Sequence, residues 1–291
     1  MGPAVFDYVA ATSVAEAVKF LADHRGEAKV VAGGHSLIPL MKLRLASPAY
    51  LVDIGRIPGL AGISESNGTV RIGALATHHD VEESPIIRER VPVLAEAAAQ
   101  IGDLQVRNKG TIGGSLAHAD PAADYPAALL ALDAEISATG SKGQRTLKVS
   151  DLFINLLTTA LNPDEIITEV RVPALTGRTG SSYQKFPHPA SRYAVVGVAA
   201  VIEISTSGNV ERAAIGVTGA GAIPVRASVA EAALTGKAID DVALGQAGDR
   251  AAEAIKDPLS DLHASAEYRR HLVRELAIRA IRVAAQRAMD M

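Results

Sequence analysis

The sequence predicts an α+β protein of two domains, the second containing a small antiparallel sheet and helices. Its length of 291 residues is the first reason, because domains typically contain roughly 100–200 residues. The second is a strand–helix–strand pattern near the N-terminus, and the third is a Gly- and Ser-rich run after residue 176 that precedes several strand-like runs. We therefore expect domains at 1–176 and 177–291, with subdomains of about 1–56 and 57–176 in the first.

The N-terminal subdomain opens with a helix at 12–24, where Thr12 or Ser13 can cap the start and apolar residues recur at helical spacing. The apolar run 28–32 predicts a buried strand that stops at two glycines. The following elements are a helix over about 37–44 and a strand at 50–54. Together they predict a βαβ unit.

The second subdomain mixes short strands with Ala-rich helices. Asn67 and Gly68 form a hairpin-type turn signal before its first strand. The segment 105–119 interrupts helical periodicity with three glycines. The expected strands are 70–76, 135–139 and 166–172, and the expected helices are 87–101 and 126–132.

The C-terminal domain follows the linker-like run 177–182. Its expected strands are 181–186, 195–204 and 210–217, and its expected helices are 227–234 and 264–289. The last helix carries several arginines between Arg269 and Arg282, interleaved with glutamates. This arrangement predicts a solvated face or a subunit contact.

Composition excludes several classes of protein. The formal net charge of −3 argues against a surface built to wrap nucleic acid. The absence of cysteine excludes disulfides, a thiolate nucleophile, cysteine-ligated zinc and an iron–sulfur cluster on this chain. With no signal peptide and no apolar run long enough to span a bilayer, we expect a cytoplasmic protein.

Two glycine-rich turns are candidate phosphate sites. Gly33-Gly34-His35-Ser36 lies between a strand and a helix, and Thr111-Ile-Gly-Gly-Ser115 lies after a polar stretch. Glycines allow several backbone N–H groups to converge on one anion. Neither turn has the Rossmann or Walker spacing, so the residues indicate a dinucleotide bound in another way. Two tight turns without a ligand remain the alternative.

The motifs at 31–39 and 105–124 resemble the FAD-binding (medium) subunit of the xanthine dehydrogenase, or molybdenum hydroxylase, family. The overall length and the segment 183–194 are most similar to the medium subunit of aerobic, molybdenum-containing carbon monoxide dehydrogenase. This resemblance covers essentially the whole chain. It implies a two-subdomain FAD-binding fold of the vanillyl-alcohol-oxidase-like (PCMH) type, followed by the family's C-terminal flavoprotein domain.

The resemblance also implies which residues contact FAD. Both glycine turns would wrap the pyrophosphate, and Asp124 would bond the cofactor's polar part. Ile101 would lie beside the flavin, Lys185 near the isoalloxazine ring and Tyr193 on the ring face. The full implied set is Ala32, Gly33, Gly34, His35, Ser36, Ile101, Thr111, Ile112, Gly113, Gly114, Ser115, His118, Asp124, Lys185 and Tyr193.

No catalytic side chain and no metal site is predicted on this chain. His78-His79-Asp80 is too short a cluster for three or four convergent ligands and suits the start of a helix. His118 fits the lining of the second glycine turn. No two aspartates share a spacing that pairs them for acid–base work.

The resemblance implies that electrons pass from a molybdenum-binding large subunit through a [2Fe–2S] small subunit to FAD, and then to a quinone or another acceptor. The expected assembly is a dimer of heterotrimers, with at most peripheral membrane association and no nucleic acid. The alternatives are the FAD subunit of a xanthine, nicotine or other N-heterocycle dehydrogenase, a stand-alone flavin reductase of the same fold, and a non-catalytic nucleotide-binding module.

Overall fold

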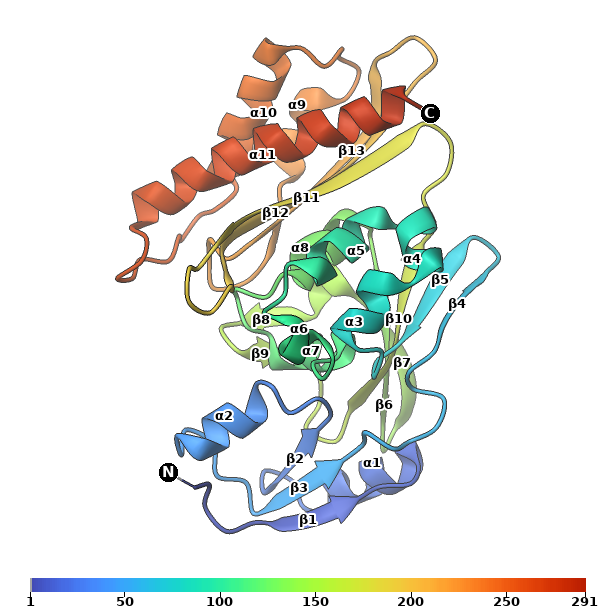
Figure 1. Cartoon of the computed structure of the whole chain (residues 1–291), viewed down its shortest axis with the longest axis vertical. Helices are drawn as coiled ribbons and strands as arrows, with labels where there is room; N and C mark the ends of the chain where they lie inside the picture. The colour runs from blue at the N-terminus through green and yellow to red at the C-terminus, as the bar shows by residue number, and fades with distance from the viewer. Residues whose placement is uncertain (1) are drawn as a thin grey trace.

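The computed structural model describes residues 2–291 as three stacked layers (Figure 1). A small parallel sheet, in the order β1-β3-β2, forms the N-terminal layer. A five-stranded antiparallel sheet, in the order β4-β5-β10-β6-β7, lies in the middle with helices beside it. A four-stranded antiparallel sheet, β11-β12-β13-β14, forms the third layer under the long C-terminal helix. The predicted α+β class and the antiparallel C-terminal sheet are confirmed.

The N-terminal layer contains the predicted βαβ unit and one further strand. Its helix α1 is capped by Ser13, whose Oγ accepts the N–H of Glu16 at 3.2 Å, and buries one apolar face. The elements are β1 (Asp7–Ala10), α1 (Val14–Asp23), β2 (Ala28–Val31), α2 (Leu37–Lys42) and β3 (Tyr50–Asp53). The four-residue edge strand β1 has too little periodicity to be recognised from sequence.

The middle layer departs from the sequence prediction in several places. The segment 105–119, expected to interrupt helical periodicity, contains α6 and α7, because Asp103 and Thr111 cap two short helices there. Strand β7 was not predicted. The expected helix 87–101 is two helices, because Pro92 has no N–H to continue the first and Val91 leaves the helical conformation, at φ −147° and ψ 57°. The elements are β4 (Ile63–Ser66), β5 (Thr69–Gly73), α3 (His78–Glu83), α4 (Pro85–Arg90), α5 (Pro92–Ala99), α6 (Leu104–Arg107), α7 (Ile112–His118), α8 (Tyr125–Ala131), β6 (Glu135–Gly140), β7 (Gly143–Lys148), β8 (Phe153–Asn155), β9 (Thr158–Thr159) and β10 (Ile166–Pro173).

The C-terminal layer contains the expected strands and one helix that the sequence analysis missed. That helix, α10, is capped by Asp240, but Gly245 and Gly248 weaken its helical signal. The elements are β11 (Thr179–Pro187), β12 (Ala194–Ile204), β13 (Val210–Thr218), β14 (Val225–Arg226), α9 (Ser228–Leu234), α10 (Asp241–Glu253) and α11 (Ala266–Met289). Within the described residues, no helix is long and apolar enough to cross a bilayer.

Arg269 of α11 is not on a solvated face, contrary to the expectation for the arginine-rich helix. It is 4% exposed, and its guanidinium donates to the carbonyl oxygens of Val195 at 2.6 Å and Gly219 at 2.8 Å. Asp261 balances its charge at 2.5 Å. Arg269 therefore fixes the start of α11 against the sheet.

The middle and C-terminal layers share one hydrophobic core. Tyr125 and Leu129 of α8 belong to the same buried cluster as Tyr183, Ala199 and Ala214 of the C-terminal sheet. The approach is close, because a Cβ on Gly216 would lie 2.0 Å from the carbonyl oxygen of Ala127. The N-terminal layer packs around two smaller clusters, one of which also includes Leu75 and Ile166 of the middle layer.

Candidate functional site

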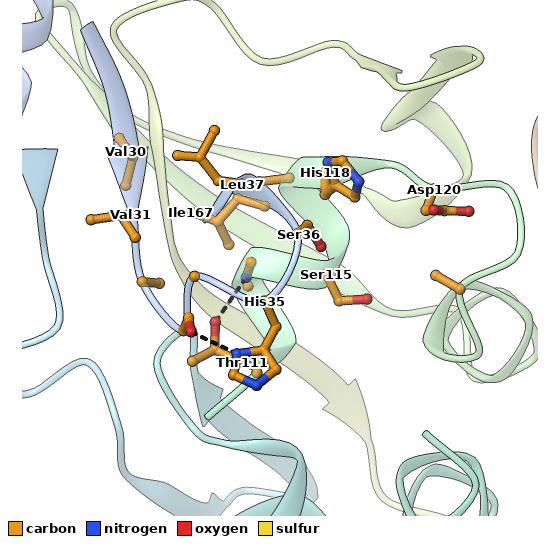
Figure 2. Close-up of a pocket in the computed structure, with 18 of the residues that line it drawn as sticks. Val30, Val31, His35, Ser36, Leu37, Thr111, Ser115, His118, Asp120 and Ile167 are labelled. Carbon is orange, nitrogen blue, oxygen red and sulfur yellow. Dashed lines mark hydrogen bonds between the residues drawn. The ribbon is translucent and has the colours of Figure 1, made fainter. Parts of the chain in front are cut away.

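A cavity of about 710 Å³ lies where the three layers meet (Figure 2). Most of its wall comes from four stretches of chain, around 28–37, 101–124, 157–167 and 191–193, and residues 74–78 add to it. The volume is in the range of pockets that hold cofactors and other small molecules.

The first glycine turn, 33–36, offers unpaired backbone donors to this cavity. In the described chain, 2–291, its four N–H groups donate to no oxygen of the protein. Gly34 has φ +74°, a conformation that side chains disfavour. The His35 ring folds back, with Nδ1 3.0 Å from the carbonyl oxygen of Gly33. The turn is therefore preorganised for an anionic group, as the sequence predicts.

The second glycine turn is built differently. It forms the start of α7, and its N–H groups already have acceptors. Ile112 donates to Ala76 O at 3.0 Å, Gly113 to Ala74 O at 2.9 Å and Gly114 to Thr111 Oγ1 at 3.1 Å. The expectation of free N–H groups here does not hold. This turn presents the side chain of Ser115 and the exposed backbone of Gly114 to the cavity.

The two turns are in direct contact. A Cβ on Gly33 would lie 2.0 Å from the carbonyl oxygen of Lys109, which no side chain can occupy. Similarly, a Cβ on Gly113 would lie 2.5 Å from the Cβ of Ala74. These glycines are thus needed for close packing as well as for ligand access.

His78 lies behind the second turn and is 5% exposed. Its backbone N–H donates to Gly110 O at 2.9 Å, and its Nδ1 lies 3.1 Å from the hydroxyl of Tyr125. Burial, followed by the charges of His35 and Arg107, lowers the pKa of His78 to about 4. The ring is therefore neutral at neutral pH and acts as a packing and hydrogen-bonding group.

Asp124 and Lys185 form a buried ion pair, with Nζ 2.8 Å from a carboxylate oxygen. Tyr183 also donates to Asp124, at 2.6 Å, and Lys185 donates to the carbonyl oxygen of Gln100 at 2.9 Å. Burial raises the pKa of Asp124 to about 6, although the lysine opposes this, and burial lowers the pKa of Lys185. The pair joins the middle layer to the C-terminal sheet.

The segment 188–193, which connects β11 to β12, brings Tyr193 to the cavity. Tyr193 is 40% exposed; partial burial, then the charge of Asp120, raises its pKa, while a hydrogen bond with Ser36 opposes the shift. Arg192, beside it, also lines the cavity and pairs with no carboxylate of residues 2–291. Sequence reasoning missed Arg192, although it immediately precedes Tyr193.

Most residues that the resemblance implies lie together around the cavity, and two do not line it. Ile112 is fully buried in the core, and the side chain of Lys185 is enclosed by its partners. The charge of Lys185 is compensated by Asp124, so Arg192 is the cation that faces this part of the cavity. The lining residues are Ala32, Gly33, Gly34, His35, Ser36, Ile101, Thr111, Gly113, Gly114, Ser115, His118, Asp124 and Tyr193.

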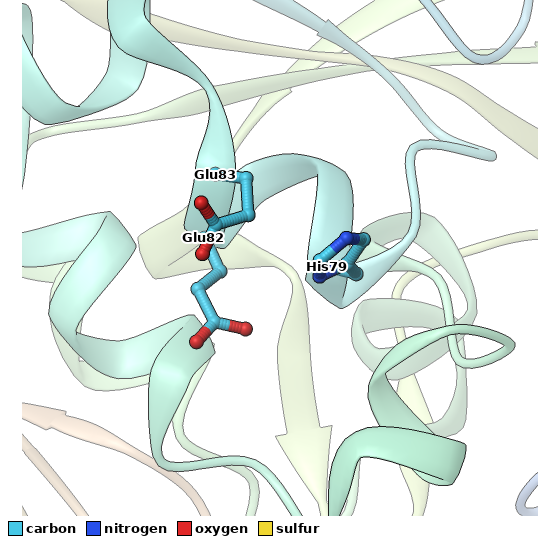
Figure 3. A group of neighbouring side chains, drawn as sticks. All are labelled: His79, Glu82 and Glu83. Carbon is cyan, nitrogen blue, oxygen red and sulfur yellow. The ribbon is translucent and has the colours of Figure 1, made fainter.

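His79, Glu82 and Glu83 lie on one side of α3 at distances that a metal ion could bridge (Figure 3). Both glutamates already have cationic partners. Arg107 lies 2.8 Å from Glu82, and Arg88 lies 2.7 Å from Glu83. These arginines neutralise the carboxylates and would repel a cation, so the group is better explained as an ion-pair network.

The chain matches two family models. Residues 4–175 match the "FAD binding domain in molybdopterin dehydrogenase", and residues 181–284 match the "CO dehydrogenase flavoprotein C-terminal domain". The first model alone covers more than half of the chain.

Similar proteins agree with these matches. The chain is 40% identical to the 6-hydroxypseudooxynicotine dehydrogenase complex subunit alpha of Paenarthrobacter nicotinovorans, over 99% of this chain and 97% of that protein. It is 41% identical to the carbon monoxide dehydrogenase medium chain of Hydrogenophaga pseudoflava, over 98% of each. Both names describe parts of multi-subunit enzymes.

Solved structures give the same result. Carbon monoxide dehydrogenase from Hydrogenophaga pseudoflava matches with a TM-score of 0.96 and 42% identity, over 99% of both chains. Quinoline 2-oxidoreductase from Pseudomonas putida 86 matches with a TM-score of 0.93 and 33% identity, over 99% of this chain and 100% of that one. The resemblance inferred from the glycine motifs is confirmed. The chain therefore belongs to the family of FAD-binding flavoprotein subunits of the molybdopterin dehydrogenases.

Proposed function

We propose that FAD lies in the cavity with its diphosphate at the first glycine turn, and that this chain relays electrons to it from a partner subunit. The observation that carries the proposal is the set of four unpaired N–H groups at 33–36, opening onto a cavity of about 710 Å³. An anion satisfies such donors, and a Cβ at Gly33 would displace the turn by clashing with the backbone of Lys109. When bound, FAD supplies the electron-transfer chemistry.

The residues around the cavity suit binding and tuning rather than acid–base work. Asp124 is held by Lys185 and Tyr183, so its carboxylate is not free to move a proton. Ser115, His118 and the other residues of the implied set would position the cofactor, and Arg192 would place a positive charge near it. A chain without cysteine holds no iron–sulfur cluster, so the electrons would arrive from another subunit.

The proposed partners are a [2Fe–2S] small subunit and a molybdenum-binding large subunit, in a cytoplasmic dimer of heterotrimers that reduces a quinone or another acceptor. The proposed domains are 1–176 for FAD, with subdomains of about 1–56 and 57–176, and 177–291 for the C-terminal domain. Support comes from similarity to relatives that are themselves subunits of larger enzymes.

Carbon monoxide is the substrate that we propose for the assembled enzyme, because the C-terminal family model is that of carbon monoxide dehydrogenase and structures of that enzyme match with TM-scores of 0.95–0.96. A second candidate is an N-heterocyclic or related alkaloid substrate, since the 6-hydroxypseudooxynicotine enzyme subunit is equally similar at 40% identity. The reacting centre would lie on the large subunit in either case.

Purification of the native complex tests the proposal. We expect this chain to copurify with the two partners and with non-covalent FAD, and the complex to reduce a dye with carbon monoxide. Dye reduction with 6-hydroxypseudooxynicotine instead would select the second candidate. A chain isolated without partners that turns over NADPH would overturn the electron-relay role and favour a stand-alone flavin reductase.

A further inference from the structure

His188 is the centre of the hydrogen bonds that shape the segment 188–193. Its backbone N–H donates to Tyr193 O at 2.8 Å, and its carbonyl oxygen accepts from Arg192 N at 2.9 Å. Its ring Nδ1 lies 3.2 Å from the N–H of Ala190 and 3.0 Å from that of Ser191. One residue therefore holds both ends of the segment that carries Tyr193 to the cavity.

These contacts determine the protonation state of the ring. Backbone N–H groups can only donate, so Nδ1 of His188 must be an acceptor without a proton. In a neutral imidazole the proton then lies on Nε2. That atom is 3.1 Å from Nε2 of His263, which must accept and must carry its own proton on Nδ1. The two rings thus form a directed pair that needs both to be neutral.

The His263 end of this pair is fixed to the core. Asp261 accepts the backbone N–H groups of His263 and Ala264, at 2.9 and 3.0 Å, and pairs with the buried Arg269. Arg269 in turn holds the start of β12. His188 therefore ties a surface segment to a rigid point of the C-terminal layer.

Arg192 shows that the segment is held against its own preference. It adopts φ +61°, a left-handed conformation that a residue with a Cβ occupies only when its surroundings impose it. Its N–H bond to His188 belongs to those surroundings. Protonation leaves that backbone bond in place but removes the ring contacts with the N–H groups of Ala190 and Ser191. The middle of the segment then loosens, which lets Tyr193 and Arg192 move away from the cavity.

We propose that His188 is a positioning residue that holds Tyr193 and Arg192 over the FAD cavity, and that protonation of the His188–His263 pair releases them. A proton added to Nδ1 of His188 removes the acceptor of two backbone N–H groups. A proton added to Nε2 of His263 places two N–H groups against each other. Either event removes a ring contact that shapes the segment.

Charged residues lie near the pair along the chain. On the connection itself these are Lys185, three residues before His188, and Arg192, four residues after it. The segment before α11 contributes Asp261, whose charge is balanced by Arg269. The variants at His188 described below keep all of these charges, so they test the effect of the histidine pair alone.

The test rests on the proposed FAD site and uses the full chain loaded with FAD. Quenching of flavin fluorescence by acrylamide, a neutral molecule, reports access to the cavity. We expect the quenching constant of the unaltered protein to rise about fivefold between about pH 8 and pH 5.5, the effect of losing one or two ordinary hydrogen bonds. The quenching constant of His188→Ala should be high at both pH values. That of His188→Gln, which cannot titrate, should be the same at both.

His271→Gln is the matched control, since this exposed ring on α11 stacks on Tyr268 outside the pair. It should keep the pH dependence of the unaltered protein. Quenching in the unaltered protein that is independent of pH, or a His188→Ala protein that matches it at both pH values, would overturn the proposal.

A second measurement needs no FAD and so separates this proposal from the proposed function. Long-range ¹⁵N–¹H spectra of histidine-labelled protein report which ring nitrogen carries the proton. We expect the Nε2–H form for His188 and the Nδ1–H form for His263, assigned by the signals lost in each variant. The opposite tautomers would refute the directed pair. If the expected tautomers are present but the chain does not bind FAD, only the proposed FAD site is refuted.

Discussion

A Cβ placed on Gly33 would lie 2.0 Å from the carbonyl oxygen of Lys109, so the two glycine-rich segments touch through backbone alone. This contact sets the spacing between the unpaired N–H groups of the first turn and the side chains of the second. The cavity therefore depends on the absence of a side chain at Gly33 as well as on its free N–H group.

Gly33→Ala should lower FAD affinity at least about tenfold, because backbone atoms must move apart and such overpacking typically costs about 1–3 kcal/mol. Titration of the FAD-free protein with FAD measures the change. Gly62→Ala is the control, since a Cβ there has nothing within 4 Å. Equal affinities for both variants would show that the close contact does not position the turn.

Asp124→Asn should destabilise the fold by about 3–5 kcal/mol, because it leaves the charge of Lys185 buried without a partner. Urea unfolding at about pH 8, above the raised pKa of Asp124, measures this loss. The double variant Asp124→Asn/Lys185→Met should recover most of it.

The exposed pair Lys19–Asp23 provides the comparison for that experiment. Asp23→Asn should leave stability nearly unchanged, since water screens the pair and holds either charge well. A similar loss in the free energy of unfolding for both aspartate variants would show that burial does not make the Asp124–Lys185 pair more important for stability than an exposed pair.

His78 should make stability depend on pH. Its folded pKa of about 4 lies below the ordinary value of 6.5, so the unfolded chain binds more protons between these pH values. Stability contributed by the neutral ring is complete above about pH 6.5 and is lost as the pH falls toward 4, by about 3 kcal/mol.

Unfolding free energies of the unaltered protein and of His78→Gln, compared at about pH 7 and pH 4.5, check this expectation. The variant should lose less stability on acidification, although it is less stable at pH 7. His271→Gln, at an exposed position, should follow the unaltered protein. Parallel losses in all three proteins would assign the acid sensitivity to other groups.

Arg192→Ala should lower the two-electron potential of bound FAD by about 20–40 mV, because a nearby positive charge stabilises the reduced, more negative flavin. Spectroelectrochemical titration measures the potential, and Arg192→Lys, which keeps the charge, should shift it less. An unchanged potential in the alanine variant would place the guanidinium too far from the ring to act on it.

Local patterns in the sequence predicted the local parts of this molecule. The βαβ unit, the turn at 33–36 and the strands of the C-terminal sheet follow from periodicity and glycine position over short windows. Even the break at Pro92 had a local signal, since proline cannot continue a helix. The cavity-facing motifs were likewise visible as two short runs.

The connections between distant residues could not be predicted in the same way. Tyr183 and Lys185 reach Asp124 across 59 and 61 residues, and no spacing rule links such positions. The acceptors that occupy the N–H groups of Ile112 and Gly113 lie on another segment, so only the fold shows that these two groups are not free. The family resemblance identified these site residues, but not the groups with which they form hydrogen bonds and ion pairs.

The packing between the layers has a consequence for how the cofactor enters. The middle and C-terminal layers share a large core, while the N-terminal layer, which provides the turn at 33–36, joins the middle layer through a small cluster that includes Leu75 and Ile166. At the proposed site, FAD would bridge these two bodies. We expect loading and exchange of the cofactor to proceed by a hinge-like separation of these bodies, without melting either one.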